Sequence, residues 1–290
     1  MSWAPLSVST VAYDGQPLEV ACASLVSLGI GVVELAYIEG YSQAFDESVF
    51  DTPNARAVRR TLSDAGLTCR ALSAHFDLSR AGGGDALRRR LDFAAEVGAQ
   101  MVATVSGPAV RREAFLQNLA QALEHAEQMG VVIALENPAD DSDATINDGA
   151  DAAQIASALA HPLVRINYDP GNFLTHRPGL APHVDMEPAL PYCIGLHLKD
   201  LRADGEGWVH TALGDGDIRW DEMFDRLATL ATPPLLSIEI PVRMRRDGRG
   251  RIVLDSTTPP LADVEALLVR SKTLVDTQIA RLEAAKITHS

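Results

Sequence analysis

The sequence predicts an α/β protein in which eight parallel strands and eight helices form a (β/α)8 barrel. Short apolar runs rich in β-branched residues recur along the 290 residues, and such runs are typical of strands buried on both faces. Helical segments alternate with these runs, which implies parallel strands joined by right-handed crossovers. A doubly wound open sheet would also satisfy the alternation, but about eight units in a chain of this length fit the closed barrel better. No change in composition marks a linker, so we expect one domain over residues 1–290.

The predicted helices are delimited by start and stop residues. The first begins at Pro17 and is followed by Gly29, and the second opens on Thr52-Pro53 and is closed by Gly66. In chain order, we predict helices over 17–28, 52–65, 85–97, 111–129, 149–159, 182–190, 220–230 and 261–285. The sixth is expected to be short and broken by prolines.

The predicted strands carry the clearest functional signal, because the last four each end in a residue type that binds metals. In chain order, the strands are 6–12, 32–35, 67–74, 101–105, 131–137, 164–168, 194–198 and 235–240. Glu136, Asp169, His197 and Glu239 stand at the ends of the fifth to eighth strands. The C-terminal ends of the strands form the functional face of such barrels, so we expect these side chains to converge.

The second and third strands also end in ionisable residues at this face. We expect Glu34 either to contact substrate or to support the ligands from behind, and we expect His75 to contact substrate. A single Glu at a strand end is more often a salt-bridge or helix-capping residue, so the prediction of a functional site depends on the group of four residues together.

Composition excludes several classes of function. A formal net charge of −14 disfavours general binding to nucleic acid or anionic lipid, because phosphate binding needs Lys and Arg. Cys22, Cys69 and Cys193 are far apart and without a CxxC pattern, which predicts buried free thiols in a reducing compartment. The sequence has neither a signal-peptide pattern nor an apolar run of about 18 residues, so we expect a cytoplasmic protein without a membrane contact.

A segment after the eighth strand stands apart. Residues 243–256 contain five arginines within nine positions, and Asp247-Gly248 predicts a hairpin turn between short strands. Either a solvated hairpin or an arm over the site or a neighbouring subunit would account for it. The segment is also the only obvious candidate for binding an anionic group of a substrate. Asp204-Gly205 predicts a comparable turn after the seventh strand.

Two Glu, one Asp and one His would give a divalent cation four ligands and leave positions for substrate oxygens. A cation that binds a carbonyl and a neighbouring hydroxyl acidifies the hydrogen beside them. Glu136 and Glu239 arise on opposite sides of such a centre, as a general base and a general acid on opposite faces of an enediolate would require. The pattern predicts an isomerase or epimerase. A lyase that expels a group from the same enediolate is the alternative.

Four motifs in this order resemble the xylose isomerase-like TIM barrels known as sugar phosphate isomerases/epimerases. They are Glu136-Asn-Pro, Asp169-Pro-Gly-Asn172, His197-Leu-Lys-Asp200 and Leu213-Gly-Asp-Gly-Asp-Ile-Arg-Trp220, and the resemblance covers essentially the whole chain. It implies a keto-sugar, polyol ketone or sugar phosphate as substrate, and often a homo-oligomer. It implies one divalent ion on Glu136, Asp169, His197 and Glu239. Mn²⁺ is expected, with Mg²⁺, Co²⁺ or Zn²⁺ as alternatives.

The resemblance further implies substrate contacts from Asn172, Lys199 and His210, although Lys199 and Asp200 could instead pair with each other. Many 3-epimerases carry a His and a Glu where this chain has Asn172 and Ser142, which puts membership of that subgroup in doubt. The zinc pattern of the related endonuclease IV is also missing, so no nucleic-acid substrate is expected. A noncatalytic carbohydrate-binding barrel is disfavoured because the four-residue ligand set is intact.

Overall fold

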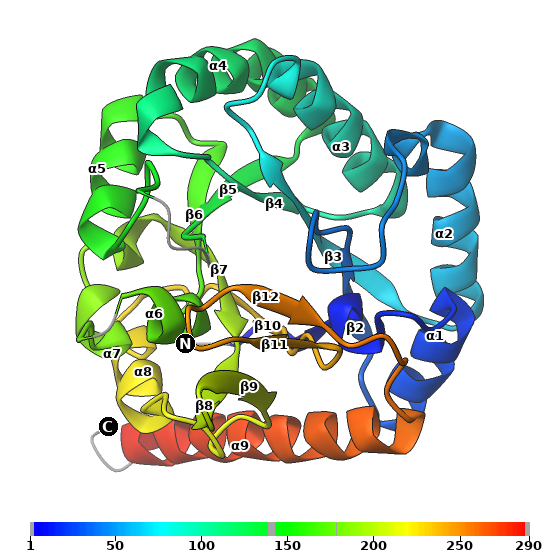
Figure 1. Cartoon of the computed structure of the whole chain (residues 1–290), viewed down its shortest axis with the longest axis vertical. Helices are drawn as coiled ribbons and strands as arrows, with labels where there is room; N and C mark the ends of the chain where they lie inside the picture. Colours follow the sequence, from blue (N-terminus) through cyan, green and yellow to red (C-terminus); the bar gives the residue numbers. More distant parts are fainter. Residues whose placement is uncertain (1–2, 139–142, 178, 288–290) are drawn as a thin grey trace.

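A closed parallel barrel forms the centre of the computed structural model, which describes residues 3–138, 143–177 and 179–287. Neighbouring strands follow the order β1-β10-β7-β6-β5-β4-β3-β2 (Figure 1). The strands are β1 (Ser7–Ser9), β2 (Val32–Ala36), β3 (Thr68–Asp77), β4 (Met101–Val105), β5 (Val132–Glu136), β6 (Val164–Tyr168), β7 (Cys193–Leu198) and β10 (Leu235–Ile238). The predicted (β/α)8 barrel is confirmed, and the open-sheet alternative is wrong.

Helices surround the barrel (Figure 1). They are α1 (Leu18–Ser27), α2 (Thr52–Asp64), α3 (Gly83–Val97), α4 (Arg112–Met129), α5 (Gly149–Leu159), α6 (Gly171–His176), α7 (Pro182–Asp185), α8 (Trp220–Leu227) and α9 (Leu261–Ile287). Short 3-10 helices are η1 (Thr10–Tyr13), η2 (Glu47–Phe50), η3 (Ala109–Arg111) and η4 (Leu190–Tyr192). None of the described helices combines the length and apolar character needed to cross a membrane.

Strand alternation decides which side chains enter the barrel. Successive residues of a strand point to opposite faces. Leu135 packs into the large apolar core that the strands share with the helices, so Glu136 points inward. In β7, His197 points inward because Leu196 and Leu198 belong to the same outer core. The barrel interior holds a separate small apolar cluster made of Ala71, Met101, Ala103 and Ala134.

Several predicted elements differ from the structure: β3 runs to Asp77, three residues beyond its expected end, and α8 ends at Leu227 instead of residue 230. The first strand was expected over 6–12, but β1 ends at Ser9, whose hydroxyl accepts a hydrogen bond from Val11 N (3.5 Å) and so caps η1. The helix expected over 182–190 is only α7 (Pro182–Asp185), followed by η4. Pro188 explains the break, because proline has no N–H to continue the helix.

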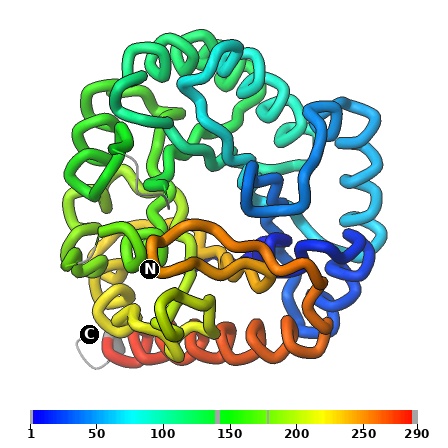
Figure 2. Tube along the Cα trace, viewed as in Figure 1, coloured from blue at the N-terminus to red at the C-terminus, as the bar shows by residue number. Residues whose placement is uncertain are grey.

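A second sheet lies at the C-terminal ends of the barrel strands. The Asp204-Gly205 turn joins β8 (Asp200–Asp204) to β9 (Gly207–Thr211), and the arginine-rich segment forms β11 (Met244–Arg246) and β12 (Ile252–Leu254). The two hairpins pair through β11 and β9, which gives the antiparallel order β12-β11-β9-β8. Figures 1 and 2 show the β11–β12 hairpin, in orange, lying across the barrel opening. The sequence predicted the turns but not their association.

Candidate active site

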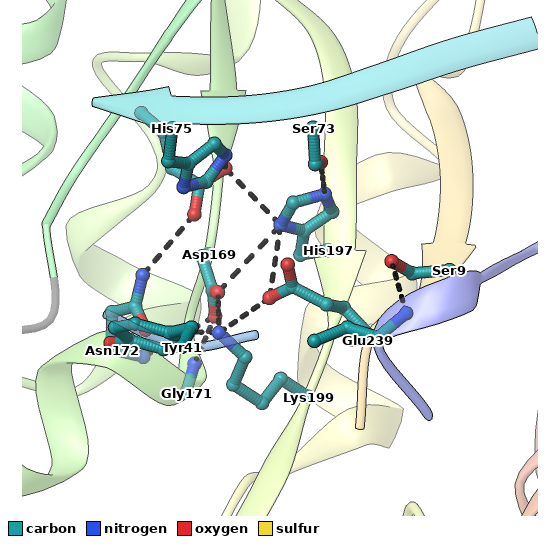
Figure 3. A network of polar contacts seen from close by, with 12 residues as sticks. Ser9, Tyr41, Ser73, His75, Asp169, Gly171, Asn172, His197, Lys199 and Glu239 are labelled. Carbon is teal, nitrogen blue, oxygen red and sulfur yellow. Dashed lines mark hydrogen bonds and ion pairs between the residues drawn. The ribbon is translucent and has the colours of Figure 1, made fainter. Parts of the chain in front are cut away.

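Four acidic and histidine side chains meet at the C-terminal end of the barrel. Glu136, Asp169, His197 and Glu239 each offer one ligand atom, these atoms lie within 4.8 Å of one another, and all four residues are buried. His197 Nδ1 is 3.1 Å from Glu136 Oε2 and 3.3 Å from Glu239 Oε2. Figure 3 shows Asp169, His197 and Glu239 directed toward one another. The convergence expected from the strand ends is therefore observed.

Asp169 is held by the short segments that follow β5 and β6. Asn137, directly after β5, donates to the Asp169 carbonyl (2.8 Å) and accepts from the Asp169 backbone N–H (2.9 Å). The Asp169 Oδ1 atom accepts from the Gly171 N–H (2.9 Å) at the start of α6. Asn137 of the Glu-Asn-Pro motif thus fixes the backbone of Asp169, and the Asp-Pro-Gly-Asn motif fixes one oxygen of its carboxylate. The other oxygen, Oδ2, faces Lys199 and His197.

Glu34 lies behind His197 and orients its ring. Glu34 Oε2 is 3.2 Å from His197 Nε2, and Ser73 donates to Glu34 Oε1 (3.0 Å). An imidazole that donates from Nε2 presents its lone pair at Nδ1, where the other acidic residues converge. Glu34 is fully buried and is not part of the cavity wall described below. Of the two roles left open by the sequence, this position favours support of His197 over contact with substrate.

The four residues fit a divalent cation. Glu239 Oε1, a buried atom of the cluster, has no hydrogen-bond partner among the described residues, and an orphaned buried acceptor is costly unless a ligand uses it. A set of three carboxylates and one imidazole suits ions such as Mn²⁺ or Mg²⁺, whereas structural zinc sites are rich in thiolate ligands. The cluster could therefore hold one divalent ion.

The electrostatics of the cluster are dominated by its carboxylates. Burial opposes a charged His197, yet Glu136, Glu239 and Glu34 together raise the pKa of its imidazole well above the usual range. Burial raises the pKa of Glu239, but His197 and Lys199 outweigh that effect and hold it well below its usual value. In the metal-free protein, cationic side chains balance the negative charge that a divalent ion would balance when bound.

Lys199 lies against two of the candidate ligands. Its Nζ is 2.5 Å from both Asp169 Oδ2 and Glu239 Oε2, and it donates to Asn172 Oδ1 (3.1 Å). Burial disfavours the ammonium, but Asp169 and Glu239 raise the pKa of Lys199 above its usual value. The stem packs on Gly171, where an added Cβ would lie 2.8 Å from Lys199 Cγ. Lys199 is therefore a fixed positive charge beside the cluster.

A cavity of about 300 Å³ opens above the cluster. Glu136 and Glu239 line it, whereas Asp169 and His197 are fully buried and lie outside the lining set. Its other lining residues are Ile38, Glu39, Tyr41, His75, Phe76, Asp77, Val105, Pro138, Asn172, Lys199 and Ile252. Only the two glutamates thus belong both to the cluster and to the space in which a substrate would bind.

The structure brings most of the predicted substrate-contact residues to this cavity. His75, Asn172 and Lys199 line it; His75 Nε2 is 3.4 Å from Glu136 Oε2, and Asn172 Nδ2 donates to Glu136 Oε1 (3.3 Å). His210 does not line it. Its Nδ1 is 2.9 Å from the Met244 carbonyl, and burial together with Lys199 lowers its pKa to about 3. A contact between His210 and substrate stays a prediction, and Ser142 lies outside the described residues.

Sequence reasoning missed Ser73 and Asn167, which hold the cluster from inside the barrel. Asn167 donates to Glu136 Oε2 (2.5 Å), and Ser73 bonds Glu34. Each is a polar residue at an inward position of an otherwise apolar strand, and that pattern could have identified both. Tyr41, in the loop between β2 and η2, also lines the cavity.

Asp200 has a structural role beside Lys199. The expected alternative of a Lys199–Asp200 pair is wrong, because Lys199 pairs with Asp169 and Glu239 while Asp200 binds the loop that follows β9. Asp200 accepts from four donors: Leu201 N (3.0 Å), Gly214 N (2.9 Å), Ile218 N (3.1 Å) and Trp220 Nε1 (2.9 Å). This carboxylate therefore organises the 212–220 loop.

Asp200→Ala should lower the free energy of unfolding by roughly 2–4 kcal/mol, because it leaves several buried N–H donors without an acceptor. Urea denaturation measures the change. Asp217→Ala is the matched control: Asp217 is an exposed aspartate of the same loop, and its loss should cost less than about 0.5 kcal/mol. Equal stability of the two variants would contradict the structural role of Asp200.

The arginines of the hairpin are largely engaged within the chain. Arg243 Nη1 is 3.1 Å from Asp14 Oδ2, Arg245 Nε is 3.8 Å from Asp255 Oδ1, and Arg251 Nη2 is 2.7 Å from Asp247 Oδ2. Arg246 is buried and donates to Tyr41. Ile252 of β12 lines the cavity and Arg246 of β11 reaches Tyr41 in the cavity wall, so the hairpin lies over the site, which is one of the two expected arrangements. Because these arginines are paired with aspartates of the same chain, the structure gives little support to the hairpin as a binding site for an anionic group of a substrate.

Comparisons with known proteins agree with the fold. The sequence profile of the family described as xylose isomerase-like TIM barrel matches residues 22–259. A search of curated proteins found no match. Among solved structures, a xylose isomerase domain protein from Planctomyces limnophilus shares 18% identity with a TM-score of 0.73, covering 98% of this chain and 100% of that chain.

Two further solved structures carry enzyme names. An L-ribulose 3-epimerase shares 16% identity with a TM-score of 0.74, covering 99% of this chain and 98% of its own. A probable 3-DHS dehydratase from Bacillus anthracis shares 13% identity with a TM-score of 0.67, covering 94% and 99%. At such low identities, these likenesses establish a common fold.

Proposed function

The chain belongs to the xylose isomerase-like TIM barrel family, and from its site geometry we propose that it is a divalent-metal-dependent isomerase or epimerase. The proposed substrate is a keto-sugar or polyol ketone, and the reaction moves a proton through an enediolate. One observation carries the proposal: Glu136 and Glu239 both belong to the four-residue cluster and both line the cavity. Two carboxylates so placed can each bind through one oxygen and present the other to substrate.

The bound cation would polarise a substrate carbonyl and acidify the adjacent C–H. Glu136, Asp169, His197 and Glu239 would hold it, with Mn²⁺ as the proposed ion. Glu239 lines the cavity and would carry a proton at one face of the substrate; its buried Oε1 atom has no hydrogen-bond partner among the described residues, so one oxygen of this carboxylate is free for that proton or for the ion. Glu136 would act at the other face, with its oxygens fixed by Asn167 and Asn172.

The charges of the cavity favour an uncharged substrate over a phosphate ester. Glu39 and Asp77 in its wall are paired with Arg80 and Arg111, and the ammonium of Lys199 is already bound to two carboxylates. Among the described residues, no other lysine or arginine lines the cavity, so a phosphate would find no unpaired cationic side chain there. We therefore propose a neutral polyhydroxy ketone.

A lyase remains the second candidate for the same site, because removal of the same proton can be followed by loss of a β-substituent. The cavity offers a group that could protonate a leaving group, His75. A structural neighbour named as a probable dehydratase has the same fold. The first committed step, proton abstraction by a glutamate, is common to both candidates.

Incubation of the Mn²⁺-loaded protein in D₂O with a panel of ketoses, inososes, 3-keto-glycosides and their phosphate esters tests the proposal. We expect deuterium in an isomer formed from an unphosphorylated ketose, since the abstracted proton exchanges with solvent before it is returned. Loss of a group without isomer formation would assign the lyase. Elemental analysis establishes that the protein holds the metal. If the metal-loaded protein exchanges deuterium into none of these substrates, both the isomerase and the lyase candidates are overturned.

A further inference from the structure

Tyr41 joins the cavity to the arginine-rich hairpin. It lies in the loop between β2 and η2 and lines the cavity together with Glu136, Glu239 and Lys199. Its ring centre is 5.9 Å from Lys199 Nζ and 5.4 Å from Arg246 Cζ. Figure 3 shows Tyr41 beside Lys199. The phenol ring thus lies in the cavity wall, close to the four-residue cluster, rather than on the outer surface.

Arg246 differs from its neighbours in the hairpin because it is buried, with an exposed fraction of 3%. Its backbone is fixed in β11 opposite Trp208 of β9. Its guanidinium donates from Nη1 to the Gly250 carbonyl (2.7 Å) and from Nη2 to the Tyr41 hydroxyl. A residue 205 positions away in sequence therefore determines where this hydroxyl lies.

The direction of that bond leaves the phenol proton free. A guanidinium can only donate, so the Tyr41 oxygen is the acceptor and its own O–H must point elsewhere. Among the described residues, the hydroxyl has no second hydrogen-bond partner besides Arg246. Burial raises the pKa of Tyr41, so the phenol keeps its proton at neutral pH. Tyr41 is then a donor on the cavity wall without an acceptor in the described protein.

We infer that Tyr41 donates a hydrogen bond to an oxygen of the substrate, and that Arg246 is the positioning residue that aims it. The inference rests on the proposed function and narrows it: the substrate carries a hydroxyl or carbonyl oxygen at the hairpin side of the cavity. It also gives the hairpin a role. Its buried arginine orients a substrate-binding phenol, while Arg243, Arg245 and Arg251 are paired with acids of the same chain.

Tyr41→Phe tests the inference, because it removes the O–H and keeps the ring. We measure binding of a ketose by calorimetry to the Mn²⁺-loaded protein, and we expect a loss of roughly tenfold in affinity, the size of one hydrogen bond of about 1.4 kcal/mol. Tyr37→Phe is the matched control from the same region, because Tyr37 packs among Phe45, Phe50 and Phe93 and does not line the cavity. Its binding should equal that of the wild type.

Monodeoxy ketoses separate a direct contact from a structural effect. The wild-type protein should bind one monodeoxy analogue about tenfold more weakly than the parent ketose, and Tyr41→Phe should bind the two equally. Tyr41 does not contact substrate if Tyr41→Phe binds the parent ketose as tightly as the wild type does. The same conclusion follows if Tyr41→Phe still binds the monodeoxy analogue about tenfold more weakly than the parent ketose. A wild-type protein that binds no ketose overturns the proposed function and this inference with it.

Arg246→Met and Arg246→Lys test the positioning role. Arg246→Met should weaken ketose binding in the wild-type background but have little further effect in Tyr41→Phe, because its action passes through the phenol. Arg246→Lys, which retains a cationic donor, should recover part of the affinity. Thermal unfolding identifies any variant whose hairpin is disrupted. Losses that simply add in the double variant would exclude positioning through Tyr41.

Discussion

Glu239→Gln should reduce kcat by roughly 10²–10⁴-fold, the range typical of losing a general acid or base. The amide can still offer an oxygen to a metal ion, but it cannot carry a proton. Glu239 Oε2 already lies 2.5 Å from Lys199 Nζ and 3.3 Å from His197 Nδ1, whereas Oε1 has no partner among the described residues. The substitution would therefore remove the proton-carrying group proposed for one face of the substrate and leave Glu136 at the other.

Steady-state kinetics with a ketose from the D₂O panel measures the effect, and elemental analysis establishes that the variant still holds its metal. Glu96→Gln is the control, because Glu96 is a surface residue paired with Arg59 (3.0 Å) and should turn over normally. Unchanged kcat in metal-loaded Glu239→Gln would refute the assignment of Glu239 as an acid or base. Loss of the metal together with activity would show a ligand role alone.

The two-glutamate arrangement makes a more specific prediction about deuterium exchange into the substrate. If each glutamate serves one face of the enediolate, a variant that lacks one of them should still move deuterium into one substrate epimer without forming the other. Glu136→Gln and Glu239→Gln should therefore show exchange with opposite epimers. Exchange with the same epimer in both variants would mean that a single base serves both faces.

The candidate metal ligands could be predicted because each depends on a local pattern. Glu136 follows a short apolar run, and the alternation of that run turns it inward once Leu135 packs outward. The same reasoning placed His197. The interior of the site also follows this rule, and Asn167 and Ser73 could have been found by asking which inward strand positions are polar.

The parts that escaped prediction depend on contacts between distant segments or on very short elements. Tyr41 gains its place from Arg246, and no local pattern pairs a loop after β2 with a hairpin after β10. The helix α6 has only six residues, too few for a 3.6-residue period to appear. The loop 212–220 was recognised from its motif, but its anchor on Asp200 appears only in the folded chain.

Glu34 presents a role that sequence left open and that experiment can decide. Its carboxylate and His197 come from positions 163 residues apart, and both side chains are fully buried. A carboxylate that accepts from Nε2 fixes the tautomer that presents Nδ1, and it makes the imidazole a better ligand. We therefore assign Glu34 to the support of His197, where its loss should affect the metal before the substrate.

Glu34→Ala should weaken Mn²⁺ binding by about 10–100-fold, the usual cost of losing the carboxylate behind a ligand histidine. Calorimetric titration of the metal-free protein with Mn²⁺ measures it without any substrate. Glu34→Gln is the matched variant: its amide oxygen can still accept from His197 Nε2, so its affinity should lie between those of the wild type and the alanine variant. If both variants bind Mn²⁺ like the wild type and only the KM for the ketose rises, then Glu34 contacts the substrate and His197 is oriented without it.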